Sequence, residues 1–252
     1  MTQPGTLTLI VYAPALVGKD GRTVDVIHGM EKALPGLRLE WRLSAGGRPI
    51  SLPQRDAWLV ESIEDGGFPI VCNGDKSYPI TVMGWGRTGL LKPGGQPQFE
   101  VHAEMPLNEA VLAAAAAVLE AMAEGARAFW GHASPYGYGS EVAQQYRHST
   151  HAPEVSPRGL PMLNLPQKLP SPEIPSFLGW LNYWSAAAAK AIGFPDPARD
   201  GALLTRALRT ASGGWVVQLT DAPLDLDNPA HLAALKRAYK RFPQVGGRVT
   251  PG

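Results

Sequence analysis

The sequence predicts an α+β protein with a mainly antiparallel sheet and helices packed against it. The chain opens with an apolar run rich in β-branched residues, an amphipathic segment and an alternating run. Short apolar runs between glycine-rich turns follow, and then long segments with helical spacing of apolar residues. Strands joined by tight turns favour antiparallel pairing, and separate helices can cover such a sheet.

The opening elements are predicted from their patterns of apolar residues. Residues 6–12 (TLTLIVY) indicate a central strand, which Pro14 ends. Residues 22–34 indicate an amphipathic helix, because apolar side chains recur along one side and a Pro-Gly pair follows. Residues 37–43 (LRLEWRL) alternate between apolar and charged side chains, which is typical of a half-buried strand.

The central region, residues 45–104, is predicted to hold short strands separated by glycine-rich turns. Asn73-Gly74 is a strong hairpin signal, because both residues tolerate positive φ. The strands are expected at residues 58–63, 69–72, 80–83 and 98–103.

Helices are expected in the second half of the chain. A long alanine-rich helix is predicted to begin after Asn108, whose side chain can cap it. The segment 174–194 contains Trp180 and Trp184 one turn apart, and we expect it to form a Trp-rich core helix near 176–192. We expect this helix to be the element around which the core is organised.

The C-terminal region predicts a hairpin and one further helix. Residues 203–210 and 215–220 are expected to pair around a Ser-Gly-Gly turn. Asn228-Pro229 then supplies a cap and a first helical residue for the last helix. Seven prolines in residues 153–175 predict an extended strap on a single domain spanning 1–252, with an interdomain linker as the alternative.

Composition excludes several classes of function. The formal net charge is +1, so nothing suggests a nucleic-acid or membrane-surface protein. The single cysteine, Cys72, cannot form an internal disulfide, and no apolar run is long enough to suggest a membrane span. We therefore expect a cytoplasmic protein.

No motif in the sequence makes a persuasive case for catalysis. Residues 84–89 match G-x-G-x-x-G, but the following LLKPGGQP cannot form the helix that a dinucleotide site requires. His148, His151 and Glu154 are close in sequence, but a solvated loop explains them better than a metal site. From these residues we expect no cofactor and no metal, and no catalytic residue stands out.

Candidate residues for binding a partner are acidic or aromatic, and most of them lie in predicted turns and loops. The acidic groups either form turns and helix caps or offer a contact patch to a basic partner. The two tyrosines either bind a partner or pack within their own loop. The candidates are Asp221, Asp225, Asp227, Glu61, Glu64, Asp65, Tyr136 and Tyr138.

Several motifs resemble bacterial immunity proteins of polymorphic toxin systems. GLPMLNLP, IPSFLGWLNYWS, IGFPD and the segment from GGWVVQL to KRAYKRF are similar to the immunity protein 52 family and its relatives, including type VI secretion immunity proteins. The N-terminal half, with LIVYAPALVG and GGFPIVCNGD, resembles an uncharacterised bacterial family of similar length.

The resemblance implies a non-enzymatic protein that binds and neutralises one cognate toxin, often a nuclease. A basic nuclease groove would favour an acidic inhibitor surface, although the net charge of this chain is only +1. The alternatives are an enzyme of unknown chemistry, using the acidic loops or the His148/His151 segment, and a generic interaction scaffold. A homodimer also remains an alternative.

Overall fold

The computed structural model describes residues 5–63, 68–87, 93–147 and 155–249. Within these residues, ten strands form one antiparallel sheet in the order β3-β2-β4-β5-β6-β1-β7-β8-β10-β9. The α+β class is therefore confirmed. The strands are β1 (Thr6–Pro14), β2 (Trp41–Leu43), β3 (Pro49–Ser51), β4 (Phe68–Cys72), β5 (Thr81–Arg87), β6 (Gln98–Pro106), β7 (Trp130–Pro135), β8 (Leu181–Trp184), β9 (Ala207–Arg209) and β10 (Trp215–Gln218).

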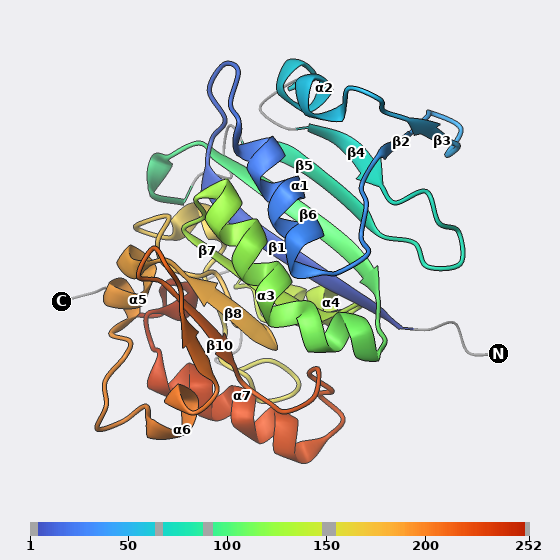
Figure 1. Cartoon of the computed structure of the whole chain (residues 1–252). Helices are drawn as coiled ribbons and strands as arrows, with labels where there is room; N and C mark the ends of the chain where they lie inside the picture. Colours follow the sequence, from blue (N-terminus) through green and yellow to red (C-terminus); the bar gives the residue numbers. More distant parts are fainter. Residues whose placement is uncertain (1–4, 64–67, 88–92, 148–154, 250–252) are drawn as a thin grey trace.

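Two long helices cover one face of the sheet (Figure 1). They approach closely where glycines remove side chains: a Cβ on Gly125 of α3 would lie 2.7 Å from the Val26 nitrogen of α1. The apolar sides of both helices and of β1 form the buried core between these layers. The helices are α1 (Arg22–Ala33), α2 (Arg55–Glu61), α3 (Glu109–Ala126), α4 (Tyr138–Ala143), α5 (Ala186–Ile192), α6 (Gly201–Leu204) and α7 (Pro229–Arg241).

The helix ends confirm the predicted caps. The Asn108 side chain accepts a hydrogen bond from the Val111 amide at 3.0 Å, so α3 begins where expected. Asn228 accepts from the Ala230 amide at 2.9 Å, and Pro229 is the first residue of α7. These signals are local and do not depend on neighbouring elements.

The predicted Trp-rich helix near 176–192 is wrong. Residues 181–184 form strand β8 between β7 and β10, and α5 begins only after Ser185, whose hydroxyl caps it. All four residues of β8 are buried, because Tyr183 packs toward α3 while Trp184 packs against Phe242 on the other side. A strand buried on both faces has no alternating pattern, so tryptophans four residues apart imitate a helix.

Three shorter predictions also need correction. Residues 58–63 lie mainly in helix α2 and its end, not in a strand. In the segment 37–43 only β2 is a strand, and Leu39 is fully buried while Trp41 is 36% exposed. The segment 203–210 divides into the end of α6 and strand β9. In each case contacts with the rest of the fold override the local pattern.

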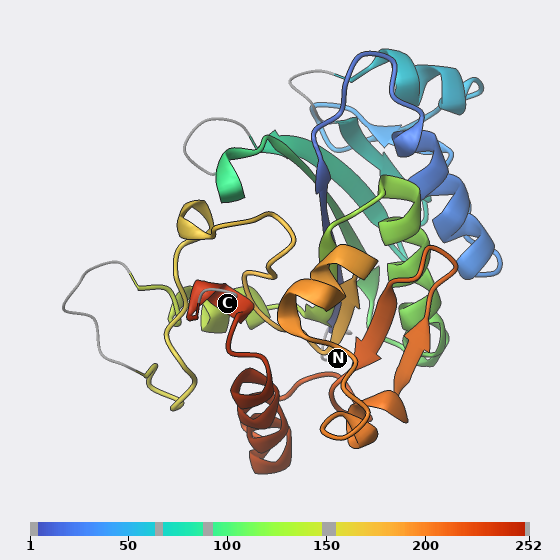
Figure 2. The same cartoon turned by 90° about the vertical axis from the view of Figure 1, so that its left-hand side faces the viewer.

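The second face of the sheet is covered unevenly. Figure 2 shows α1 and α3 on one side of the sheet and the proline-rich segment, residues 155–180, on the other. This segment packs inward through apolar side chains: Leu160, Leu163, Leu169 and Ile174 are buried. Within the described part of the chain, no helix combines the length and apolar character needed to cross a membrane.

Candidate functional site

Strand β6 places a row of polar side chains on the second face of the sheet. Its alternate residues Phe99, Val101, Ala103 and Met105 are buried within the hydrophobic core. Because successive side chains of a strand point to opposite faces, the residues between them point away from that core. They are Gln98, Glu100, His102 and Glu104.

Strand register brings these polar residues close to others in β1 and β7. Ile10 of β1 lies directly opposite His102 on one side and His132 on the other. Two residues away along β1, Thr8 lies between Glu104 and Ser134. Directly opposite residues share a face, so two histidines, a carboxylate and two hydroxyls gather on the same surface.

A cavity of about 380 Å³ opens over β1 and β7 beside helix α4. Tyr136, which is 75% exposed, and the buried Tyr138 belong to its wall. The Tyr138 hydroxyl donates to the Leu178 carbonyl at 2.6 Å and so ties the loop to the segment before β8. The lining residues are Thr8, Ile10, Glu104, His132, Ser134, Pro135, Tyr136, Gly137, Tyr138, Gly139, Ser140 and Phe177.

His132 is a buried titratable group of this cavity, with 4% of its surface exposed. Its ring lies 4.6 Å from the ring of Phe177 and 6.4 Å from that of Trp130. Neither ring nitrogen has a hydrogen-bond partner among the described residues. Burial, with a smaller contribution from nearby His102, lowers the pKa of His132 to about 3. The ring is therefore neutral at physiological pH.

An aromatic and acidic surface continues from the cavity toward β5. Trp85 is 40% exposed, and its ring lies 4.2 Å from that of His102. The His102 Nε2 atom is 3.5 Å from a carboxylate oxygen of Glu100. We call Trp85, His102, Glu104 and Tyr136 the open face, because each retains contact with solvent on this side of the sheet.

The acidic candidates Asp221, Asp225 and Asp227 lie on the loop before α7 and do not line the cavity. Asp221 forms an ion pair with Arg206 at 2.9 Å, and Asp227 forms one with Arg158 at 2.8 Å. Asp225 accepts a hydrogen bond from the Asp227 amide. Two of the three carboxylates are thus partly neutralised within the chain.

The remaining candidates are scattered or lie outside the described residues. Glu61 is exposed at the end of α2. Glu64 and Asp65 lie outside the described residues, as does the segment with His148, His151 and Glu154. In the described ranges, no group of three or more His, Cys, Asp or Glu side chains is arranged to hold a metal ion.

Sequence reasoning missed Trp85, His102, Glu104 and His132. One signal was available, since polar residues occupy every second position of QFEVHAEMP in β6. His132 gave no such signal, because strand β7 was not expected and the sequence after residue 131 shows no periodicity. Tyr136 and Tyr138 were identified, and the cavity brings both together with His132.

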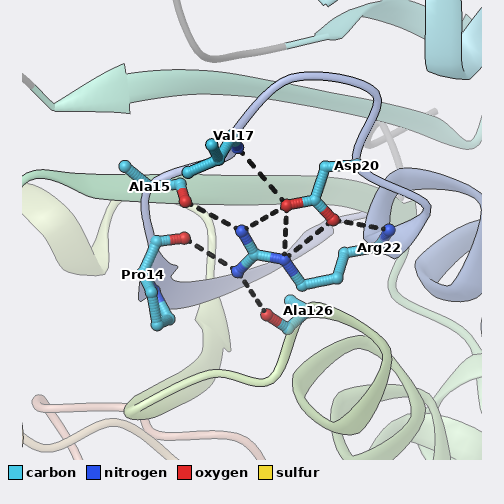
Figure 3. Close-up of polar contacts among 6 residues, drawn as sticks. All are labelled: Pro14, Ala15, Val17, Asp20, Arg22 and Ala126. Carbon is cyan, nitrogen blue, oxygen red and sulfur yellow. Dashed lines mark hydrogen bonds and ion pairs between the residues drawn. The ribbon is translucent and has the colours of Figure 1, made fainter.

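A separate cluster of polar groups surrounds the buried charge of Arg22, away from the cavity (Figure 3). The Arg22 guanidinium donates to the Asp20 carboxylate at 2.7–3.0 Å. It also donates to the carbonyls of Pro14, Ala15 and Ala126 at 2.8, 2.9 and 3.1 Å. The hydrogen bonds from Arg22 lower the pKa of Asp20. All five guanidinium N–H groups have acceptors, so the cluster closes the loop after β1 and offers no free group to a ligand.

The fold and the open face define an α+β protein with helices on one face of the sheet and a partly exposed cavity on the other. Residues 18–250 match the family described as "Domain of unknown function (DUF5953)", and the chain belongs to this family. A search of curated proteins found no match.

A solved structure of the "Pseudomonas aeruginosa T6SS protein PA0821" is similar in fold. The TM-score is 0.55 with 16% sequence identity, and the match covers 94% of this chain and 74% of the other. At this identity the likeness concerns the fold alone.

Proposed function

We propose that this protein is a non-enzymatic immunity protein that binds and neutralises a cognate toxin of a type VI secretion system in the cytoplasm. The observation that carries the proposal is the open face, where the exposed Trp85 contacts His102 and the exposed Tyr136 lines a cavity together with Glu104. The likeness in fold to a protein named for that secretion system supports it. So does the resemblance of the sequence motifs to immunity proteins.

The chemistry of the open face suits a protein partner. Tryptophan and tyrosine are enriched among the residues that contribute most to protein–protein affinity, because they bury large area at low entropic cost. Glu104 adds a negative charge to this face, and a basic toxin surface would complement it. A nuclease toxin fits this complementarity, since its substrate groove must attract phosphates.

A catalytic role for the cavity is the weaker candidate. An effective general base has a pKa near the working pH, whereas burial lowers the pKa of His132 to about 3. The Ser134 hydroxyl accepts a hydrogen bond from the Trp180 amide at 3.3 Å, which is a structural contact. These properties favour binding over proton transfer.

Co-expression with the toxin encoded beside this protein tests the proposal. We expect the wild-type protein to restore growth and to co-purify with the toxin. Trp85→Ala and Tyr136→Ala should each weaken the complex at least tenfold, which corresponds to about 1.4 kcal/mol. The control is Leu208→Ala, which removes a 57% exposed apolar side chain from edge strand β9.

The control variant should bind the toxin as the wild type does. Thermal denaturation of each variant separates loss of binding from loss of folding. If the wild-type protein neither rescues growth nor co-purifies with the toxin, the proposed function is wrong.

A further inference from the structure

The cavity beside α4 contains hydrogen-bonding capacity that the described residues do not use. His132 is almost completely buried, and both of its ring nitrogens lack partners among those residues. A buried donor or acceptor without a partner costs about 1–3 kcal/mol. An occupant that supplied a hydrogen bond here would recover part of this free energy, so the ring indicates a polar ligand.

The charged and neutral groups in the cavity wall indicate the sign of the ligand's charge. Glu104 is exposed and lines the cavity, and no lysine or arginine of the described ranges forms an ion pair with it. His132 adds no positive charge, because burial keeps its imidazole neutral. The wall therefore carries one anionic group and neutral hydroxyl and imidazole groups, which favours a cation.

The aromatic wall distinguishes between kinds of cation. Phe177 and Tyr136 both line the cavity. A planar guanidinium stacks on aromatic rings and is more weakly hydrated than an ammonium group. Its five donors can also serve two separated acceptors at once, such as a carboxylate and an imidazole nitrogen.

We propose that this cavity is a guanidinium-binding site that receives an arginine side chain of the bound toxin. At the exposed end of the cavity, Glu104 pairs with the guanidinium. At the buried end, an N–H group of the guanidinium donates to His132. The nitrogens of His132 have almost no contact with solvent, so this binding mode requires the ring to turn about its Cβ–Cγ bond before it can accept. The volume of about 380 Å³ lies within the usual range of ligand cavities. The choice of the toxin as source rests on the proposed function.

The first test uses the protein alone and N-acetyl-arginine amide as the probe. Titration followed by NMR should shift the ring nitrogen signals of His132 in a saturable manner. N-acetyl-citrulline amide, which has nearly the same shape without the charge, should bind at least tenfold more weakly. Equal shifts with both compounds, or shifts that do not include His132, would overturn the guanidinium site.

A matched pair of variants tests the role of the carboxylate. Glu104→Gln should weaken binding of the arginine probe at least tenfold, because it keeps the size of the side chain and removes its charge. Glu40→Gln changes an exposed glutamate that is absent from the cavity wall, so it should bind the probe normally. If both variants bind as the wild type does, Glu104 does not recognise the cation and the proposal fails.

Co-purification with the toxin separates this inference from the proposed function. If the toxin binds Glu104→Gln as tightly as wild type, the toxin does not place an arginine in the cavity, and the immunity proposal stands. If no toxin binds while the arginine probe shifts His132, the immunity proposal is wrong and the guanidinium site stands without the toxin as its source. If the toxin binds the wild type and binds Glu104→Gln more weakly, the result supports both the immunity proposal and the guanidinium site.

Discussion

Arg22 and His132 are both buried polar side chains, and they lie on different sides of the sheet. Every N–H group of Arg22 has an acceptor in Asp20 or in a backbone carbonyl. Neither nitrogen of His132 has a partner among the described residues, although the ring lines a cavity. The difference separates a group whose hydrogen bonds stabilise the fold from one whose hydrogen-bonding capacity the described residues leave unused.

The physical basis of this contrast is the cost of removing polar groups from water. A buried charge is tolerated when hydrogen bonds replace its hydration, as they do around Arg22. A neutral imidazole costs less to bury, so a site can hold it without partners until a ligand arrives. The contrast predicts opposite responses to mutation in the two regions.

The largest effect is expected from Arg22→Met. The variant keeps an apolar stem but leaves three carbonyls without the guanidinium donors, and the Asp20 carboxylate keeps only the backbone amides of Val17 and Arg22. Breaking such a buried pair costs about 3–5 kcal/mol in the free energy of unfolding, which urea denaturation measures.

The matched control for Arg22 is Arg199→Met. Arg199 pairs with Asp196 at 2.6 Å, but its side chain is 64% exposed. Exposed pairs contribute about 0–1 kcal/mol, so this variant should unfold close to the wild type. Equal losses in the two variants would mean that burial and full hydrogen bonding do not distinguish Arg22.

The second effect is a pH response of about 2 kcal/mol that depends on His132. Its folded pKa of about 3 lies below the ordinary 6.5, so between these values the unfolded chain binds a proton that the folded chain does not. Stability from this residue is complete above pH 6.5 and falls as the pH drops. From pH 7 to pH 5 the loss is about 2 kcal/mol.

His132→Phe should lack this loss, and urea denaturation at pH 7 and pH 5 measures it. If His132→Phe loses as much stability at pH 5 as the wild type, His132 is not buried in its neutral form.

A smaller effect is expected from Tyr138→Phe, in the wall of the cavity. The variant removes the hydroxyl that donates to the buried Leu178 carbonyl. Loss of one buried hydrogen bond costs about 1–2 kcal/mol, and thermal denaturation should show a lower midpoint. No change in the midpoint would indicate that the loop around α4 does not depend on this bond.

The smallest effect on folding is expected from Asp225→Lys. This variant tests whether the toxin contacts the acidic loop before α7 or only the open face. Asp225 is exposed, so stability should change by less than about 0.5 kcal/mol. If the loop contacts a basic toxin, association should slow, and the difference should diminish at high salt. An unchanged association rate would remove this loop from the interface and leave the open face as the candidate.

The sequence by itself determined the α+β class, the first strand and helix, and the starts of α3 and α7. These features depend on local signals, namely periodicity over one element and side-chain caps at Asn108 and Asn228. Such signals act between residues close along the chain, so they can be read without the fold. The same reasoning failed for residues 181–184, where burial on both faces removed the alternation of a strand.

Only the tertiary structure decided where the candidate site lies. Glu104 and His132 are separated by β1, and the register of three strands places them on one surface. The loop directly after β7 then adds Tyr136, and the distant segment before β8 adds Phe177 to the same cavity. Strand pairing between distant segments leaves little local trace in the sequence, because it depends on the burial of whole faces of the sheet.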